Sequence, residues 1–167
     1  NNHIYYTTSW ADDGLTWEVP RLLVSKHWLP SATINEKGEV ELYANDNSIN
    51  GRVVRMNMSK SGIDLTKTEQ MNYGVTDNYS NPHVRYMPSQ DTYYMIAERT
   101  TPFNSIDTFS STDGLTWKQI NRDVVAVESG QFVIGSPAFS TENPRLVFFG
   151  TTANPSWLDF KIRYIES

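Results

Sequence analysis

The chain contains no cysteine, which excludes disulfide bonds and thiol chemistry. It also lacks a run of apolar residues long enough to cross a bilayer, and it lacks any block of like charges. The formal net charge is -5, and this acidic balance argues against a nucleic-acid partner. No spacing of His, Asp and Glu suggests a metal site. We therefore predict no nucleic-acid binding, no membrane insertion and no cofactor.

What the chain does have is an abundance of strand-forming residues. Aromatic residues make up 13% of its 167 residues, and Thr, Val, Ile and Tyr cluster in short runs. No segment shows a convincing helical period. The length suits one domain with a sizeable core. These observations predict an all-β protein.

Three sequence features recur at intervals of about fifty residues. A turn glycine recurs at spacings of 48 and 52, at Gly14, Gly62 and Gly114. A proline recurs at spacings of 52 and 55, at Pro30, Pro82 and Pro137. A strand-like run follows each proline, at VELYAND (40–46), YYMIAER (93–99) and LVFFGTT (146–152). Three features that keep one period indicate a repeated structural unit.

Each repeat reads as a series of antiparallel strands. Turn-forming residues separate each proline-containing segment from the strand-like run, as in a β-hairpin. A third strand follows at 51–59, 105–111 and 160–167, and a fourth is expected at 116–120. Four antiparallel strands in fifty residues are typical of a β-propeller blade. The predicted division is a part-blade 1–27, a blade 28–78, a blade 79–130 and a part-blade 131–167.

The ends of the sequence do not coincide with the ends of blades. The first predicted strand, at 3–9, aligns with the third strand of a blade, and the last one, at 160–167, is again a third strand. The first residue is Asn rather than Met, so we expect a processed or trimmed chain. We interpret the chain as a segment of a larger propeller. Two alternatives are that the part-blades complete a small ring, and that self-association or a partner chain supplies the missing strands.

Two turns have nearly the same sequence, ADDGLTW at 11–17 and SSTDGLTW at 110–117. They resemble the Asp-box turn of sialidase-like propellers and, more closely, the Ser-x-Asp-Gly-x-x-Trp turn of arabinanase, xylosidase and fructosidase propellers. A third copy has Ser61 in place of Asp and Leu65 in place of Trp, which a structural turn tolerates and a catalytic carboxylate would not. We therefore interpret the turn residues as structural: Asp13, Gly14, Trp17, Asp113, Gly114 and Trp117.

The resemblance also implies where a site would lie. Propeller glycosidases bind sugar at the starts of the innermost strands and just after the second strands, on the face opposite these turns. Glu98 and Asp46 occupy such places, so they are the candidate catalytic carboxylates. Fructosidase-like members carry Arg-Asp-Pro at an innermost strand, where this chain has Ser80-Asn81-Pro82. Because Asn cannot act as a base or nucleophile, this departure weakens the prediction of catalysis.

The same face offers candidate ligand-binding side chains. Aromatic planes stack on sugar rings, and Asn, Arg, Thr and His bond their hydroxyl groups. The predicted binding residues are Trp28, Asn45, Asn81, His83, Arg99 and Thr151. Further aromatic and amide residues that flank the face are Tyr79, Phe103, Trp157, Asn47, Asn50 and Asn104. For each one singly, a structural role is a standing alternative.

The function predicted from these features is carbohydrate recognition by a glycosidase-like propeller that is binding-only or catalytically reduced. Examples of such a role are a bacterial surface protein and a phage receptor-binding protein, so we expect an extracellular location or one on a cell or virion surface. The first alternative is a fragment of an active glycoside hydrolase, with a carboxylate pair as acid and base. The second is a protein-interaction propeller, since one fold hosts many functions.

Overall fold

The computed structural model describes residues 2–9, 14–49, 52–59, 62–63, 68–101, 105–126, 133–140, 146–152 and 161–166. Within these ranges the chain is all-β, apart from one turn of 3-10 helix at Asn47–Ile49. The predicted fold class is therefore confirmed. No helix in the described part is long and apolar enough to span a membrane.

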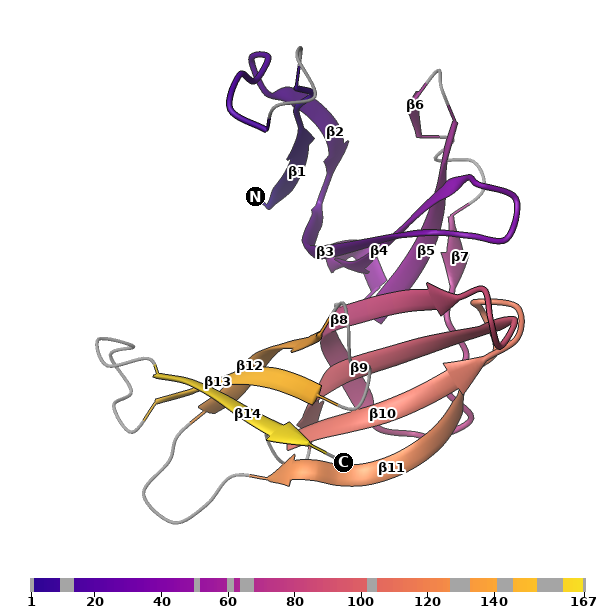
Figure 1. Cartoon of the computed structure of the whole chain (residues 1–167), viewed down its shortest axis with the longest axis vertical. Coiled ribbons are helices and arrows are strands. Elements are labelled where there is room, and N and C mark those ends of the chain that lie inside the picture. Colours follow the sequence, from indigo (N-terminus) through magenta and orange to yellow (C-terminus); the bar gives the residue numbers. More distant parts are fainter. Residues whose placement is uncertain are drawn as a thin grey trace.

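The strands form four antiparallel sheets that follow one another along the chain (Figure 1). The first sheet pairs β1 (His3–Tyr6) with β2 (Arg21–Ser25). The second contains β3 (His27–Ile34), β4 (Val40–Asp46) and β5 (Arg52–Ser59), with the short β6 (Gly62–Ile63) and β7 (Glu69–Gln70) both paired to β5. The third contains β8 (Asn78–Met87), β9 (Thr92–Thr101), β10 (Ser105–Ser111) and β11 (Lys118–Ala126). The last contains β12 (Val133–Phe139), β13 (Leu146–Thr152) and β14 (Lys161–Glu166).

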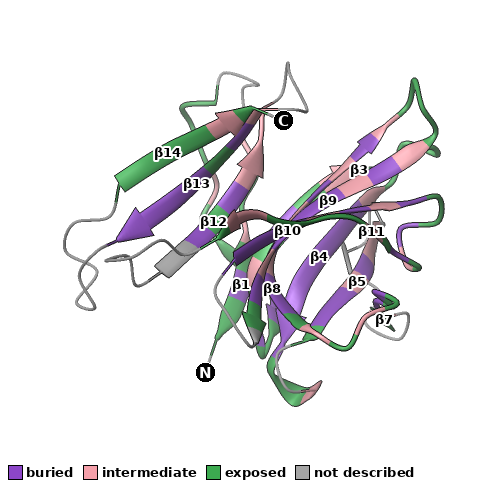
Figure 2. Cartoon of the chain, turned by 90° about the horizontal axis from the view of Figure 1, so that it is seen from below, coloured by how far each residue is buried: buried purple, intermediate pink, exposed green. Residues whose placement is uncertain are grey.

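The strand β4 is buried on both faces because the second sheet packs between the first and the third. In β4, Leu42 and Ala44 join a cluster with Ile4 of the first sheet, whereas Tyr43 joins a cluster with Val84 of the third. Figure 2 shows this burial along β4, in contrast to the largely exposed β14. A strand buried on both faces reads as a continuous apolar run. That is why β4 and β13 coincide with the runs at 40–46 and 146–152.

The turn between β10 and β11 is closed by local hydrogen bonds around Asp113. Its Oδ1 accepts bonds from the backbone N–H groups of Leu115 at 2.8 Å and Thr116 at 2.7 Å, and from the Ser111 hydroxyl at 2.9 Å. Partial burial by itself raises the pKa of Asp113, but these hydrogen bonds outweigh it and lower the pKa to about 2. Gly114 supplies the φ of 70° that the turn needs.

This turn also joins the third sheet to the second. Arg55 Nη1 donates to the carbonyl oxygen of Asp113 at 2.6 Å, and the Tyr43 hydroxyl donates to that of Gly114 at 3.3 Å. Trp117 is buried, and its ring meets Tyr43 edge-on, with the ring centroids 6.3 Å apart. The turn therefore packs into the seam between the two sheets.

The matching turn near the N-terminus differs in its packing. Gly14 has a φ of 66°, and Trp17 Nε1 donates to the Gly14 carbonyl oxygen at 3.0 Å. Trp17 is nevertheless 55% exposed. Asp13, Ser61 and Leu65 lie outside the described residues. The two turns thus share a glycine with positive φ, while Trp117 of the later turn is buried and Trp17 is not.

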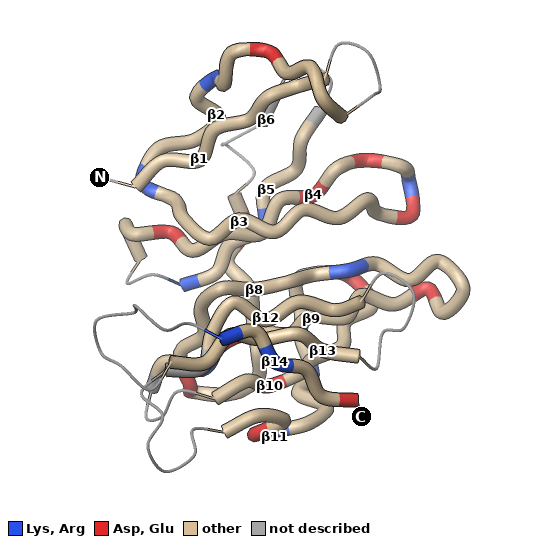
Figure 3. The backbone as a smooth tube through the Cα atoms, turned by 60° about the vertical axis from the view of Figure 1, so that its left-hand side comes forward, with Lys and Arg blue, Asp and Glu red and all other residues tan. Residues whose placement is uncertain are grey.

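Charged residues are distributed along the chain without a block of one sign (Figure 3). Lys, Arg, Asp and Glu together make up 20% of the residues. The formal net charge is -5, so binding of an anionic ligand would depend on a local cation.

Candidate functional site

The first strands of three successive sheets are interrupted at the same place. In β3, β8 and β12 the strand register shifts at an X-Pro pair. The residue before each proline has a positive φ: 49° at Leu29, 52° at Asn81 and 52° at Ser136. A residue before proline normally adopts extended backbone, and a non-glycine residue in the left-handed region costs about 1–2 kcal/mol. Because such strain often lies at functional sites, these three bulges mark a candidate site.

Glu98, on β9, lies against two of these bulges. The Asn81 side chain donates a hydrogen bond to its carboxylate, and a Cβ placed on Gly135 of β12 would lie 3.2 Å from Glu98 Oε2. Burial raises the pKa of Glu98 to about 7, against the opposing effect of the Asn81 hydrogen bond. A carboxyl group with this pKa is partly protonated at neutral pH, so it can donate as well as accept a hydrogen bond.

Asn81 connects Glu98 to the neighbouring innermost strand. Its Nδ2 atom lies 3.3 Å from the Ser136 hydroxyl oxygen and donates to it. Ser136 is exposed and Asn81 is half-buried, so their polar groups border solvent. The structure thus brings Glu98, Asn81 and Ser136 into one polar cluster. The sequence placed Ser136 at the corresponding strand start but did not single it out, although its alignment with Asn81 in the repeat was the available signal.

The other carboxylate candidate, Asp46, already has local partners. Its Oδ1 accepts hydrogen bonds from the Ser48 backbone N–H at 2.7 Å and the Ser48 hydroxyl at 2.6 Å, and its Oδ2 lies 3.6 Å from His27 Nε2. Burial by itself raises the pKa of Asp46, but the Ser48 hydrogen bonds outweigh it, so the pKa is lowered. Asp46 is buried and stays ionised, as expected for a residue that shapes a turn.

Three predicted ligand residues make hydrogen bonds inside the protein. Asn45 is fully buried, and its Oδ1 accepts a hydrogen bond from the Asn81 backbone N–H at 3.0 Å. His83 Nδ1 accepts one from the Phe139 backbone N–H at 3.1 Å, and burial, with the Arg85 charge, lowers the pKa of His83. Thr151 is buried, and its hydroxyl oxygen accepts a hydrogen bond from Arg163 Nε at 3.1 Å. These contacts hold strands and sheets together.

Arg99 belongs to a buried ion cluster and is only 2% exposed. Its guanidinium group donates to Asp123 and to the Ser105 hydroxyl, and it lies 3.7 Å from the Asp107 carboxylate and 3.8 Å from that of Asp77. Asp107 is fully buried. The sequence placed Arg99 on the ligand face, whereas the structure turns its side chain toward these partners because a buried carboxylate needs a charged neighbour.

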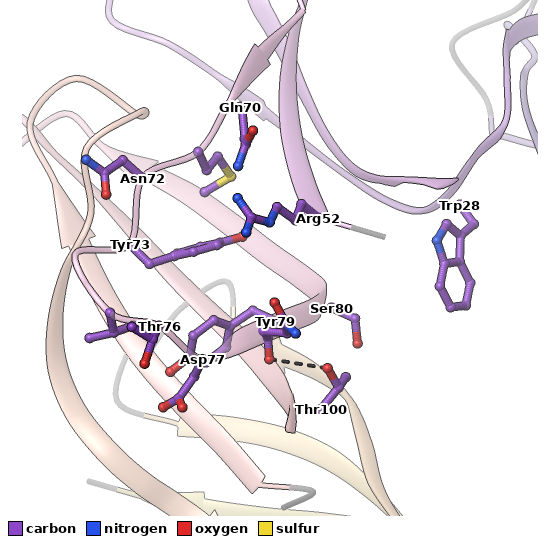
Figure 4. A pocket seen from close by; sticks show the side chains of 13 residues that line it. Trp28, Arg52, Gln70, Asn72, Tyr73, Thr76, Asp77, Tyr79, Ser80 and Thr100 are labelled. Carbon is purple, nitrogen blue, oxygen red and sulfur yellow. Dashed lines mark hydrogen bonds between the residues drawn. The ribbon is translucent and has the colours of Figure 1, made fainter. Parts of the chain in front are cut away.

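Trp28 borders a cavity of about 920 Å³ that lies between the second and third sheets. Figure 4 shows Trp28 apart from the other lining residues, across from Arg52 and Ser80. Tyr79, another predicted aromatic, lines the cavity but is buried, and its hydroxyl donates to Asp107 at 2.8 Å. Sequence reasoning missed Arg52, Tyr73 and Asp77, because the last two lie in the connection between β7 and β8, outside the strands that the repeat aligns.

Some predicted positions cannot be placed. Asn50, Phe103, Asn104 and Trp157 lie outside the described residues. Within the described part, no group of three or more His, Asp or Glu side chains is arranged to hold a metal ion. The candidate site is therefore made of Glu98, Asn81, Ser136 and the neighbouring cavity.

Comparison with known proteins places the fold. No protein-family model matches the chain, and no curated protein matches its sequence. An endo-1,4-β-xylanase from Bacteroides thetaiotaomicron matches with a TM-score of 0.68 at 12% identity, over 89% of this chain and 57% of that one. An endo-arabinanase of glycoside hydrolase family 43 from Bacillus licheniformis matches with a TM-score of 0.68 at 9% identity, over 96% and 62%. An arabinanase from Bacillus subtilis matches with a TM-score of 0.67 at 11% identity, over 98% and 63%.

The chain therefore spans between 57% and 63% of the length of these enzymes. The resemblance to arabinanase-type propellers is confirmed at the level of the fold. At these identities the likeness establishes architecture and not activity. The described strands form part of a β-propeller of the kind found in glycoside hydrolases.

Proposed function

We propose that this chain is a carbohydrate-recognising propeller module with reduced or absent catalysis. The observation that carries the proposal is the polar cluster of Glu98, Asn81 and Ser136 at the strained starts of innermost strands. These groups offer hydroxyl, amide and carboxyl partners that match the hydroxyl groups of a sugar. The proposed partner is a glycan or polysaccharide. The proposed location of this protein is extracellular or on the surface of a cell or virion.

The chemistry of the cluster favours binding over hydrolysis. Glycoside hydrolysis needs two carboxyl groups, one as acid and one as base or nucleophile. Glu98, with a pKa near 7, suits the acid. The three strained positions before proline carry Leu29, Asn81 and Ser136, none of which can act as the second carboxylate. Asp46, the other candidate, is engaged by Ser48 and His27.

The turn residue Asp113 is assigned a structural role. In the β9–β10 ladder Ser111 pairs with Tyr93, whereas Glu98 pairs with Ile106. Five residues of extended strand separate Tyr93 from Glu98, a distance of about 17 Å. The lowered pKa of Asp113 follows from its backbone hydrogen bonds and keeps it ionised, so it cannot serve as a proton donor.

An active glycoside hydrolase remains the second candidate, and the raised pKa of Glu98 is the observation that favours it. In that case the second carboxylate would come from residues outside the described ranges or from a longer native protein. A catalytic pair would then span the bond to be cleaved. The two candidate functions assign Glu98 different roles, as a sugar-binding group or as a catalytic acid. A substitution of Glu98 therefore distinguishes them.

The experiment is a glycan array combined with hydrolysis assays on aryl glycosides, for wild type, Glu98→Gln and Ser136→Ala. We expect binding of at least one glycan, weaker binding by Ser136→Ala, and no hydrolysis. Ser110→Ala, on β10, is the matched control and keeps full binding. Absence of all glycan binding would refute the proposal. Hydrolysis that disappears in Glu98→Gln would establish the enzyme instead.

A further inference from the structure

The cavity between the second and third sheets has the size and lining of a ligand site. Its volume of about 920 Å³ lies within the range of about 300–1,000 Å³ that is usual for small-molecule pockets. Strand starts line one part of it, with Trp28 from β3, Arg52 from β5 and Ser80 from β8. Figure 4 shows Tyr73 and Tyr79 along its inner side, with polar side chains around the opening. Aromatic planes edged by polar groups suit a sugar ring.

Trp28 is the aromatic residue that a ligand can reach. It is 37% exposed, and it lines both this cavity and a second hollow of about 500 Å³ that His3 and Tyr5 border. Trp28 therefore borders open space in two hollows. A tryptophan that only filled the seam between sheets would be covered, as Trp117 is. The indole is thus available as a stacking plate for the apolar face of a sugar.

The cavity lining carries one carboxylate, Asp77, and one cation, Arg52. The Asp77 carboxylate lies 3.1 Å from Arg122 Nη2 and 3.8 Å from Arg99 Nη1, two cations that also face Asp123. Arg52 is exposed and has no ion-pair partner within 4 Å among the described residues. Figure 4 shows its guanidinium group directed into the cavity beside Tyr73.

The residue opposite Arg52 does not neutralise it. In the β4–β5 ladder Arg52 pairs with Asp46, whose carboxylate is held by Ser48 and faces His27. A guanidinium group binds a carboxylate through two parallel charge-assisted hydrogen bonds, which are about twice as strong as bonds between neutral groups. A sugar that carries a carboxylate therefore complements this cavity better than a neutral one.

The cavity adjoins the Glu98 cluster. Ser80 lines the cavity and lies directly opposite Glu98 in the β8–β9 ladder. The next residue, Asn81, donates to Glu98 and to Ser136. Paired residues of an antiparallel ladder have Cα atoms about 4.5–5.5 Å apart. One oligosaccharide can therefore contact the Glu98 cluster with one sugar and the cavity with another.

We propose that this cavity is a second sugar subsite, in which Trp28 stacks on and Arg52 binds an acidic sugar of an extended glycan whose neighbouring sugars lie over Glu98. This inference rests on the proposed function and names its ligand class, a uronic-acid-containing oligosaccharide. The cluster at Glu98 binds the hydroxyl groups of one sugar, and the cavity binds the carboxylate of the acidic sugar. The two subsites together select a chain over a single sugar.

The test is calorimetric titration with oligomers of uronic acids and with the same oligomers after methyl esterification, which neutralises each carboxylate and adds one methyl group to it. We expect the acidic form to bind at least about tenfold more tightly. Arg52→Gln should abolish that preference, and Trp28→Ala should weaken both forms. Arg21→Gln is the matched control, because it removes one positive charge from an exposed side chain on β2 that pairs with Glu18.

The outcomes separate this inference from the proposed function. Equal affinity for the acidic and esterified oligomers, or a preference that survives Arg52→Gln, would overturn the acidic subsite. Binding of neutral glycans that weakens in Ser136→Ala, without any acidic preference, would leave the proposed function standing alone. If no glycan bound, both the acidic subsite and the proposed function would be refuted. Urea unfolding of Arg52→Gln and Trp28→Ala confirms that each variant is folded.

Discussion

The side-chain Oδ1 of Asn45 accepts a hydrogen bond from the backbone N–H of Asn81, at 3.0 Å, across the seam between the second and third sheets. The Nδ2 of the same amide donates to the carbonyl oxygen of Tyr79 at 3.3 Å. One fully buried side chain therefore fixes the backbone on both sides of Ser80, where β8 begins its bulge. This bulge positions the Asn81 side chain beside Glu98 and Ser136.

Replacement of Asn45 by Ala should destabilise the fold, because it leaves the Asn81 N–H and the Tyr79 carbonyl without their buried partner. We expect a loss of about 2–3 kcal/mol in the free energy of unfolding, measured by urea denaturation. Asn47→Ala, at an exposed position two residues later in the 3-10 turn, should cost less than about 0.5 kcal/mol. Equal costs in the two variants would show that Asn45 does not hold the bulge.

Gly114 and Gly14 form a matched pair for testing the turn that docks between sheets. Both have positive φ, 70° and 66°, so Ala at either position incurs the same backbone cost of about 1 kcal/mol. A Cβ at Gly114 would also lie 2.6 Å from the Tyr43 hydroxyl, whereas a Cβ at Gly14 meets no atom within 4 Å. Gly114→Ala should therefore destabilise by at least about 1 kcal/mol more than Gly14→Ala.

Thermal and urea denaturation measure that difference. If the two variants unfolded at the same midpoint, the contact between the turn and Tyr43 would contribute nothing to stability. A larger loss in Gly14→Ala would contradict the assignment of the 110–117 turn as the docked one.

The raised pKa of Glu98 makes stability depend on pH. The folded state holds this proton up to about pH 7, whereas the unfolded chain releases it near 4.5. The free energy of unfolding should therefore fall as pH rises from about 4.5 to about 7, by up to about 3 kcal/mol. Below about pH 4.5 both the folded and the unfolded chain hold the proton, so Glu98 causes no change in stability. Above about pH 7 the loss of stability is complete.

Glu98→Gln removes this titration without changing the shape of the side chain, so its stability curve should lack the decline. Urea midpoints at intervals between pH 4 and pH 8 give the difference between the two proteins. His83, whose pKa is lowered, acts in the opposite sense but is present in both and cancels. Parallel curves would mean that Glu98 keeps an ordinary pKa in the folded protein.

Arg99 should be a stability determinant, since it is the buried cation among Asp77, Asp107 and Asp123. Arg99→Met leaves the fully buried Asp107 without its charged neighbour and should cost about 3–5 kcal/mol. Arg122→Met removes a half-exposed partner of Asp77 and should cost about 1 kcal/mol or less. If the order of these two losses in urea denaturation were reversed, the cluster would not depend on Arg99.

Part of the site could be predicted from the sequence because it repeats. The prolines at 30, 82 and 137 aligned the three strand starts, and the runs at 40–46, 93–99 and 146–152 located β4, β9 and β13, although β9 continues beyond Glu98 to Thr101. Glu98 was found in this way. The directions of the Asn45 and Arg99 side chains could not be predicted, because each can face either a ligand or a neighbouring sheet. Packing of the sheets decides between the two.

The cavity residues escaped prediction for a different reason. Tyr73 and Asp77 lie in the connection between the second and third sheets, which has no counterpart in the repeat pattern, and Arg52 is one charged residue among many. Their common position depends on contacts between residues distant in the sequence. Periodicity carries no information about such contacts.

The sequence by itself determined that this protein is all-β and built of propeller blades, because strand patterning, turn glycines and the repeat period are local properties of the chain. Only the tertiary structure decided which polar residues face solvent. Glu98, Asn81 and Ser136 meet at two strained bulges, while Asn45, Arg99 and Asp46 turn toward partners inside the fold. The physical reason is that a buried polar group must find its hydrogen bonds within the protein, and packing of the sheets determines which groups are buried.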